Sequence, residues 1–373
     1  MRKILVSMIL VMIVNACACA DIIYTTDAGN LGLIKVQSQT SVDLYGTQYS
    51  GVGRDSLLDA YWNSGTSRII LVDRTTNTAT SGDTALIFKP SDLTHPIDSE
   101  PKVLSGVYDT QALVSSYNGK GLFFASGASI HEFSTEDFSL SRSYRYTPDT
   151  SEDITPSIKS LLTGQYTVYA LVEQDSSEDI LLVFDGQLRD DTGKNFAKYR
   201  APSGAEMIVW LKGSVLALAH DDGVSYLNSS VGFYSVVSSD APVKALCRDS
   251  GSGFYFAEQV QSGDSYTTTL RHYSSETKTS TTLHAETGDS VSRLLYDDDG
   301  GVLAALLGNK VFLYNLRGDA LIAEYDNSLL GGKPVQIALS YSSGDDGKNS
   351  SGCDMSGGGI LLLLIGAMIF RRR

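Results

Sequence analysis

The sequence predicts an all-β protein, specifically a β-propeller with seven four-stranded blades. Three observations lead to this prediction. Apolar residues recur with a period of two in short runs, which is typical of β-strands. Most runs form pairs with a third run ahead of them, and these sets repeat roughly every 40 to 50 residues, as blades do. The first pair, residues 22–26 and 31–36, has no run ahead of it, whereas residues 335–341 form a single run with no pair behind it.

These two incomplete sets complete one another if the chain closes into a ring, which is how propellers join their ends. The predicted blades are, in order, 22–50 closed by 335–341, 54–108, 109–150, 155–200, 204–240, 243–287 and 290–330. Six or eight blades remain alternatives. Two β-sandwich domains would not explain the lone run at 335–341. No proline-rich linker or change in composition divides residues 21–341, so we expect one domain.

The N-terminal segment has the features of a signal peptide. Arg2 and Lys3 precede an apolar run over residues 4–14, and Ala18-Cys19-Ala20 places small residues at the two positions that a signal peptidase reads. We therefore expect residues 1–20 to be removed by cleavage between Ala20 and Asp21. A lipobox with Cys17 as the lipidated residue is an alternative. An uncleaved anchor is a weaker one, because the apolar run is short for a membrane span.

The C-terminal segment predicts a membrane anchor. Residues 342–354 form a tether rich in Ser, Gly and Asp, and residues 355–370 contain no charge and would span roughly 24 Å as a helix. Arg371, Arg372 and Arg373 follow, and the positive-inside bias places them in the cytoplasm, with the propeller on the other side of the membrane. A buried core helix is the alternative, but such helices do not usually end a chain in three arginines.

This tail resembles a known class of bacterial sorting signals. Ser351-Gly352-Cys353-Asp354, a glycine-containing spacer, an apolar helix and terminal arginines resemble the Synerg-CTERM class, and the Myxo-CTERM class is similar. The resemblance implies recognition by a dedicated membrane protease and delivery to the cell envelope or surface, with Cys353 as the signature residue. It covers only residues 350–373 and implies nothing about the activity of the remainder.

Composition limits the classes of partner. The net charge is −14, which makes nucleic acid an improbable partner, and 42% hydrophobic residues with 20 tyrosines exclude a disordered stalk. Cys17 and Cys19 would leave with the signal peptide, so Cys247 is the single cysteine of the predicted propeller. It lies in the apolar run 243–247, which predicts a buried, inert thiol.

Known catalytic and metal-binding patterns are missing from the sequence. Asp297-Asp298-Asp299-Gly300-Gly301 has glycine at the fifth position, where a calcium loop needs an oxygen ligand, so a hairpin turn explains it better. The five histidines have no metal-ligand spacing, and no nucleophile elbow, phosphate loop or Cys-x-x-Cys occurs. We therefore assign no catalytic residue, cofactor or metal from the sequence.

One acidic cluster is a candidate ligand-face rim. Glu173, Asp175, Glu178 and Asp179 lie in one predicted inter-strand loop. If this loop projects on the same face as the loops that join the blades, its carboxylates would surround the central funnel and could bind cations or a basic partner. The alternative is an ordinary solvated charge run.

Three functional classes follow from these features. The first, which we favour, is a non-catalytic binding or scaffold propeller displayed in the cell envelope, with an envelope protein or glycan as its ligand. The second is a propeller hydrolase or lyase acting on glycans or peptides, for which carboxylates from different blades would have to converge within about 5 to 10 Å. The third is an assembly factor or sensor, which is weakened because the sequence shows nothing after Arg373 in the cytoplasm.

Overall fold

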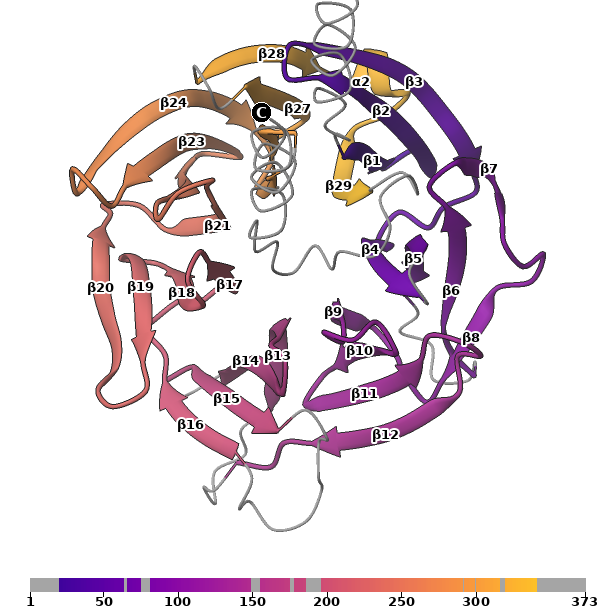
Figure 1. Ribbon diagram of the computed structural model, residues 1–373, viewed down its shortest axis with the longest axis horizontal. Coiled ribbons are helices and arrows are strands. Elements are labelled where there is room, and N and C mark those ends of the chain that lie inside the picture. Colours follow the sequence, from indigo (N-terminus) through magenta and orange to yellow (C-terminus); the bar gives the residue numbers. More distant parts are fainter. Residues whose placement is uncertain are drawn as a thin grey trace, which may run out of the picture.

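Seven β-sheets form a ring around a central axis (Figure 1). The computed structural model describes residues 20–63, 66–74, 81–148, 155–174, 178–185, 196–290, 292–298, 300–315 and 319–340. Six sheets have four antiparallel strands each. The seventh has five, because two short strands pair with different parts of its third strand. The predicted seven-bladed propeller is therefore confirmed.

The blades are numbered in chain order, and the strands of each are given from the axis outward. Blade 1 contains β29 (Pro334–Ser340), β1 (Asp21–Thr26), β2 (Asn30–Ser38) and β3 (Ser41–Ser50). Blade 2 contains β4 (Leu57–Asn63), β5 (Thr66–Asp73), β6 (Gly82–Lys89), β7 (Asp92–Pro96) and β8 (Lys102–Ser105). Blade 3 contains β9 (Thr110–Ser115), β10 (Gly121–Ser126), β11 (Ser129–Ser134) and β12 (Leu140–Arg145). Blade 4 contains β13 (Pro156–Thr163), β14 (Thr167–Gln174), β15 (Ile180–Asp185) and β16 (Phe196–Arg200).

The remaining three blades have the same four-strand order. Blade 5 contains β17 (Met207–Leu211), β18 (Val215–His220), β19 (Gly223–Asn228) and β20 (Gly232–Ser238). Blade 6 contains β21 (Val243–Arg248), β22 (Phe254–Ser262), β23 (Ser265–Ser274) and β24 (Thr279–Gly288). Blade 7 contains β25 (Ser292–Asp297), β26 (Val302–Leu307), β27 (Lys310–Asn315) and β28 (Ala320–Tyr325).

Blade 1 closes the ring by joining distant parts of the chain. Its innermost strand, β29, pairs antiparallel with β1, so that Tyr24 lies opposite Ile337. Both side chains are fully buried and pack with Val302 and Leu313 of blade 7. This is the closure predicted from the lone run at residues 335–341.

The hydrophobic core lies between the blades rather than on one side of each sheet. Five of the six residues of β10 and all six of β26 are buried, because neighbouring blades cover both faces of these strands. Such strands carry nearly continuous apolar runs, unlike the alternating pattern of a sheet with one solvated face. The outermost strand β12 shows the opposite behaviour, since five of its six residues are exposed.

Blade 2 departs from the regular pattern at its outer edge. Two short strands, β7 and β8, pair with different parts of β6, with Pro96 opposite Phe88 and Ser105 opposite Gly82. Pro96 and Pro101 border the intervening segment, and proline has no backbone N–H with which to continue a sheet. The outer strand of this blade is therefore broken into two pieces.

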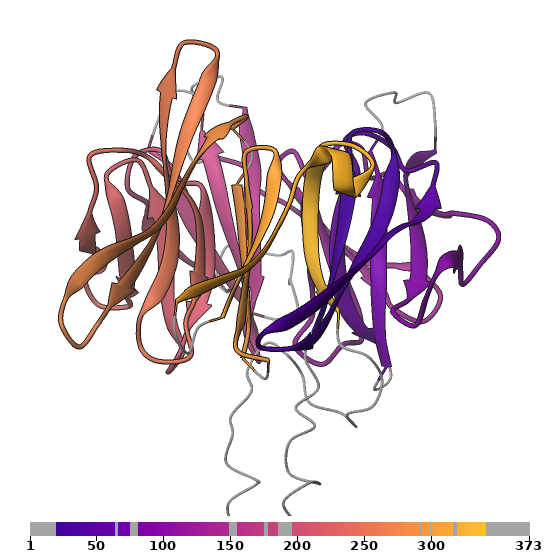
Figure 2. The same ribbon diagram turned by 90° about the horizontal axis from the view of Figure 1, so that it is seen from above.

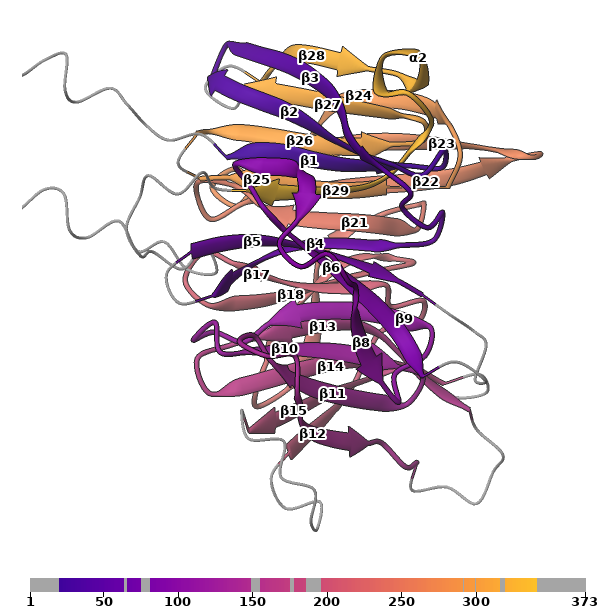
Figure 3. The same cartoon turned by 90° about the vertical axis from the view of Figure 1, so that its right-hand side faces the viewer.

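The strand directions give the ring two distinct faces. The loops that join successive blades lie on the same face as the loops between second and third strands, and we call this the joining face. The hairpin of β22 and β23 projects from it (Figure 2). Ser340, the end of the innermost strand β29, pairs with Asp21 on the opposite face, which we call the terminal face (Figure 3).

One short helix, α2 (Asn327–Leu330), precedes β29 in the described part of the chain. The Asp326 carboxylate caps it by accepting hydrogen bonds from the backbone N–H groups of Ser328 and Leu329, at 3.0 and 3.2 Å. None of the described residues forms a helix long and apolar enough to cross a bilayer. The predicted span at 355–370, the tether at 342–354 and the arginines at 371–373 lie outside the described residues.

Candidate functional site

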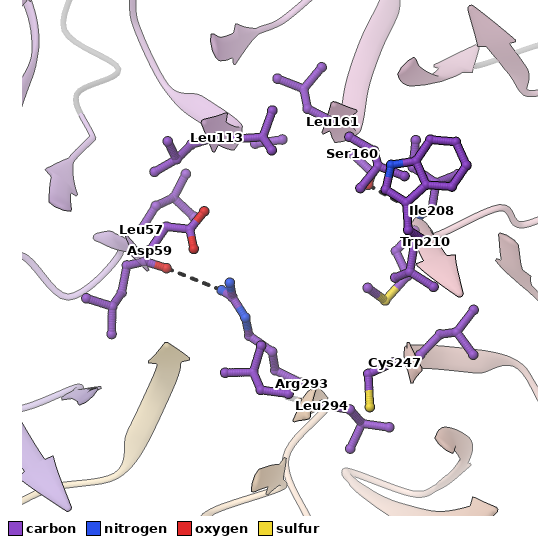
Figure 4. A pocket seen from close by; sticks show the side chains of 18 of the residues that line it. Leu57, Asp59, Leu113, Ser160, Leu161, Ile208, Trp210, Cys247, Arg293 and Leu294 are labelled. Atoms are coloured by element: carbon purple, nitrogen blue, oxygen red, sulfur yellow. Dashed lines mark hydrogen bonds between the residues drawn. The ribbon is translucent and has the colours of Figure 1, made fainter. Parts of the chain in front are cut away.

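The seven innermost strands surround a central channel that contains a cavity of about 610 Å³ (Figure 4). This volume falls in the range of small-molecule sites, which are usually concave and mostly apolar with a few placed polar groups. Most of the wall is built from aliphatic side chains of different blades. Among them are Leu57, Leu113, Leu161, Ile208, Leu294 and Leu339.

Asp59, on β4, is the carboxylate among the described residues that line this cavity. Its Oδ1 accepts a hydrogen bond from the backbone N–H of Ala60 at 2.9 Å. Burial raises the pKa of the Asp59 carboxyl above its ordinary value, and this outweighs the lowering caused by the Arg293 charge and by the Ala60 N–H. A carboxyl group is thus held in a largely apolar channel with only one backbone donor.

Arg293, on β25, reaches past the innermost strand of blade 1. Its Nη1 donates a hydrogen bond to Oε1 of Gln336 at 2.6 Å. It also approaches the backbone oxygen of Leu58 at 3.5 Å (Figure 4). The guanidinium and the Asp59 carboxylate are directed toward the same part of the channel (Figure 4). The two groups attract each other electrostatically without forming a contact ion pair.

The other charged side chains of the lining are engaged within the protein. Nζ of Lys159 lies 2.8 Å from Oε1 of Glu173, and Nη2 of Arg248 lies 2.5 Å from Oδ2 of Asp298. Among the described residues of the lining, Asp59 and Arg293 are therefore the charged groups that form no contact ion pair.

Asp59 gives rise to a stability prediction. Because its pKa is higher in the folded protein than its ordinary value of 3.8, the folded state holds the proton more tightly, and stability falls as the pH rises above about 3.8. Asp59→Asn removes this dependence. We expect the variant to gain stability over the wild type as the pH rises, by no more than about 1.4 kcal/mol per pH unit. Urea unfolding of both proteins between pH 4 and 8 measures the difference in unfolding free energy. If the advantage of Asp59→Asn decreased as the pH rises, the raised pKa of Asp59 would be contradicted.

Of the predicted acidic rim, Glu173, Glu178 and Asp179 border the connection between β14 and β15, the second and third strands of blade 4, at the joining face. Glu173 is paired with Lys159, and Nε of Arg200 lies 3.0 Å from Oε2 of Glu178. Burial raises the pKa of Asp179, while Asp175 lies outside the described residues. The cations come from neighbouring strands, so much of the negative charge seen in the sequence is locally compensated.

Of the residues predicted for signal-peptide cleavage and C-terminal sorting, the structure describes Ala20 and Asp21. Ala20 is buried, and its backbone N–H donates a hydrogen bond to Oδ2 of Asp297 at 2.9 Å. Asp21 begins β1 and accepts a hydrogen bond from Val36 N–H at 3.3 Å. Ala18 lies outside the described residues. So do the sorting-motif residues Ser351, Gly352, Cys353, Arg371, Arg372 and Arg373.

The remaining sequence candidates have structural roles. Cys247 is buried at 8% exposure, and burial raises the pKa of its thiol, as expected for an inert cysteine. The aspartate and glycine turn after Asp297 connects β25 to β26, with Gly301 N–H donating to the Asp297 carbonyl at 2.8 Å. Within the described ranges, no group of three or more His, Cys, Asp or Glu side chains could hold a metal ion.

Sequence reasoning missed both Asp59 and Arg293. A signal for them existed, because each is a charged residue inside an apolar run that was predicted to be the first strand of a blade. First strands line the axis of a propeller, so a charge within such a run is placed near the channel. The run alone does not show whether that charge faces the channel or a neighbouring blade.

Comparisons with known proteins support the fold. No family model and no curated protein matches this chain. A candidate 6-phosphogluconolactonase from Bacteroides fragilis is similar in structure, with a TM-score of 0.62 at 13% identity, over 86% of this chain and 98% of the other. A second, from Bacteroides uniformis, has a TM-score of 0.61 at 13% identity, over 86% and 99%. The periplasmic gluconolactonase PpgL of Pseudomonas aeruginosa has a TM-score of 0.56 at 11% identity, over 87% and 99%. At these identities the similarity shows a shared propeller fold.

Proposed function

We propose that this chain is an exported β-propeller that acts as a non-catalytic binding or scaffold module in the bacterial cell envelope. Residues 355–370 would hold it in the membrane, and a C-terminal sorting protease could then release it to the surface. The central channel is the observation that carries the binding role, because it is a ligand-sized cavity whose described lining offers a single carboxylate. Carboxylate-pair hydrolysis would need a second one.

The positions of Ala20 and Ser340, the first and last described residues, support this arrangement. Ala20 and Ser340 lie on the terminal face, next to the β1 and β29 pairing. The joining face, with Glu173, Glu178 and the β22–β23 hairpin, lies at the opposite end of the channel (Figure 3). An anchor that follows Ser340 would therefore direct the joining face away from the membrane, where an envelope protein or glycan could reach it.

The sorting role leads to a prediction about maturation. Replacing Cys353 by alanine, or Arg371–Arg373 by alanines, is expected to abolish most processing and to leave the protein in the wrong fraction, because both features would be read by the sorting protease. Cell fractionation and intact mass measure the result. Cys247→Ala is the matched control, since this buried cysteine lies inside the propeller. Normal mass and location of both tail variants would refute the sorting role.

Binding through the channel is tested with a pair of tryptophan variants. Leu113→Trp would fill the cavity, whereas Leu140→Trp places the same residue on the outer strand β12, where Leu140 is 47% exposed. We expect purified full-length protein to retain envelope components, and Leu113→Trp alone to lose them. Equal retention by both variants would exclude the channel as the binding site.

A second candidate function is lactone hydrolysis. The names of the similar solved structures and the presence of Asp59 and Arg293 in the channel favour it. Water would add to the lactone carbonyl as Asp59 accepts its proton, and Arg293 would stabilise the oxyanion. Collapse of this intermediate would break the ring C–O bond while Asp59 returns the proton to the leaving alkoxide, which gives the hydroxy acid.

Hydrolysis of δ-valerolactone and glucono-δ-lactone, followed by pH-stat titration, separates the two functions. Hydrolysis that is faster than the spontaneous reaction with the wild type, and falls to the spontaneous rate with Asp59→Asn, would establish a lactonase. Rates equal to the spontaneous rate for both lactones would support a binding protein.

A further inference from the structure

We infer that the channel binds a small molecule with an apolar body and one uncharged polar head, which donates a hydrogen bond to Asp59 and accepts one from Arg293. The inference rests on the proposed function in taking the channel as the ligand site, and it adds the chemical class of the ligand.

Unused hydrogen-bonding atoms support this assignment. Among the described residues, the Asp59 side chain accepts one hydrogen bond, from Ala60 N–H, and its Oδ2 has no donor. Arg293 uses Nη1 toward Gln336 and Leu58, which leaves Nε and Nη2 available. A hydroxyl or amide head can donate and accept at once, so it can satisfy both groups together.

The charges of the two groups favour a neutral head. Asp59 and Arg293 point into the same part of the channel, so an anion that approaches Arg293 also meets the Asp59 carboxylate, and a cation at Asp59 meets the guanidinium (Figure 4). Like charges placed close together in a partly buried site repel each other more strongly than they do in water. A neutral head avoids this repulsion while keeping both hydrogen bonds.

The wall favours an apolar body. Leucine and isoleucine side chains from several blades, including Leu113, Leu161 and Ile208, line the cavity around the polar pair. A hydroxyl placed against such a wall without a partner loses its hydrogen bonds to water and gains none in return. The aliphatic part of the wall offers no partner to the several hydroxyls of a polyhydroxylated sugar acid, so it favours an apolar body.

Three matched probes test the inference on the purified full chain. Benzamide, benzoate and benzylammonium share one ring but have neutral, negative and positive heads. We expect saturation-transfer NMR titrations at pH 7 to show benzamide binding about tenfold more tightly than either ion, and more tightly than myo-inositol. Trp210, which lines the channel, supplies a fluorescence readout of the same titrations.

Two variants make the test specific. Asp59→Leu leaves the guanidinium alone in the channel and is expected to shift the preference to benzoate. Arg293→Met leaves the carboxylate alone and is expected to shift it to benzylammonium. Asp59→Asn and Arg293→Lys are conservative replacements to be used if either first variant fails to fold. Asp59→Asn should also raise the affinity for benzoate. Arg293→Lys keeps the positive charge, so benzoate and benzylammonium should both still bind more weakly than benzamide.

Any one of three results would overturn the inference. The wild type could bind the three probes equally, neither replacement could change the order of preference, or myo-inositol could bind more tightly than benzamide. These outcomes are independent of export, because they are measured on purified protein. If the protein is found outside the cell envelope but the Asp59 and Arg293 variants still change the preferred probe, the envelope role is refuted and the ligand class stands.

Discussion

Replacing Gly32 by alanine is expected to lower the free energy of unfolding by about 3 kcal/mol. Gly32 lies opposite Tyr24 in the pairing of β1 with β2, and a Cβ atom at Gly32 would collide with the ring of Tyr24. Tyr24 is fully buried in the closing blade and cannot move aside without disturbing its packing against Val302 and Leu313. Urea unfolding followed by circular dichroism measures the loss.

Gly251→Ala is the matched control, because a Cβ there meets only the Asp249 carboxylate at an ordinary 3.5 Å or more. We expect it to change stability by less than about 0.5 kcal/mol. Tyr24→Phe should leave stability unchanged or raise it, since the buried Tyr24 hydroxyl has no hydrogen-bond partner among the described residues. An unfolding midpoint for Gly32→Ala equal to that of the wild type would show that the ring accommodates the methyl group.

Asp83→Ala is expected to cost about 4 kcal/mol. Asp83 is fully buried, and its Oδ2 accepts hydrogen bonds from the N–H and the hydroxyl of Thr110, at 2.8 and 2.6 Å. Oδ1 accepts a third from Asp109 N–H at 3.2 Å. These bonds connect β6 of blade 2 to the start of blade 3, so the substitution leaves buried donors without acceptors at a contact between blades.

Asp92→Ala provides the comparison within the same blade. The Asp92 carboxylate also bonds to a threonine, accepting from the N–H and hydroxyl of Thr94 at 3.0 and 2.5 Å, but its side chain is 51% exposed. Water can replace those bonds, so we expect a loss of at most about 1 kcal/mol. Similar losses for the two alanine variants would mean that burial of Asp83 contributes little.

Much of the fold was predictable because its signals are local and repeated. Runs such as those that form β10 and β26 are apolar enough to be recognised singly, and their regular recurrence favoured seven blades over six or eight. The broken outer edge of blade 2 was not predicted, since β7 and β8 are short and pair with different parts of one strand.

The site was predictable only in part. Glu173 and Glu178 were recognised as part of an acidic cluster, but their partners Lys159 and Arg200 come from other strands of the blade. Arg293 is separated from its hydrogen-bond partner Gln336 by 43 residues, and no spacing rule connects them.

The sequence by itself determined the class of fold, and it predicted seven blades and the closure of blade 1 by residues from both ends of the propeller, whereas the structure decided between six, seven and eight blades. These predictions follow from hydrophobic periodicity, which each strand carries within its own residues. Only the tertiary structure decided that Asp59 and Arg293 share the channel while Lys159 and Arg248 are paired elsewhere. Their partners depend on how neighbouring blades are aligned, and that alignment arises from packing between blades rather than from any one segment of the chain.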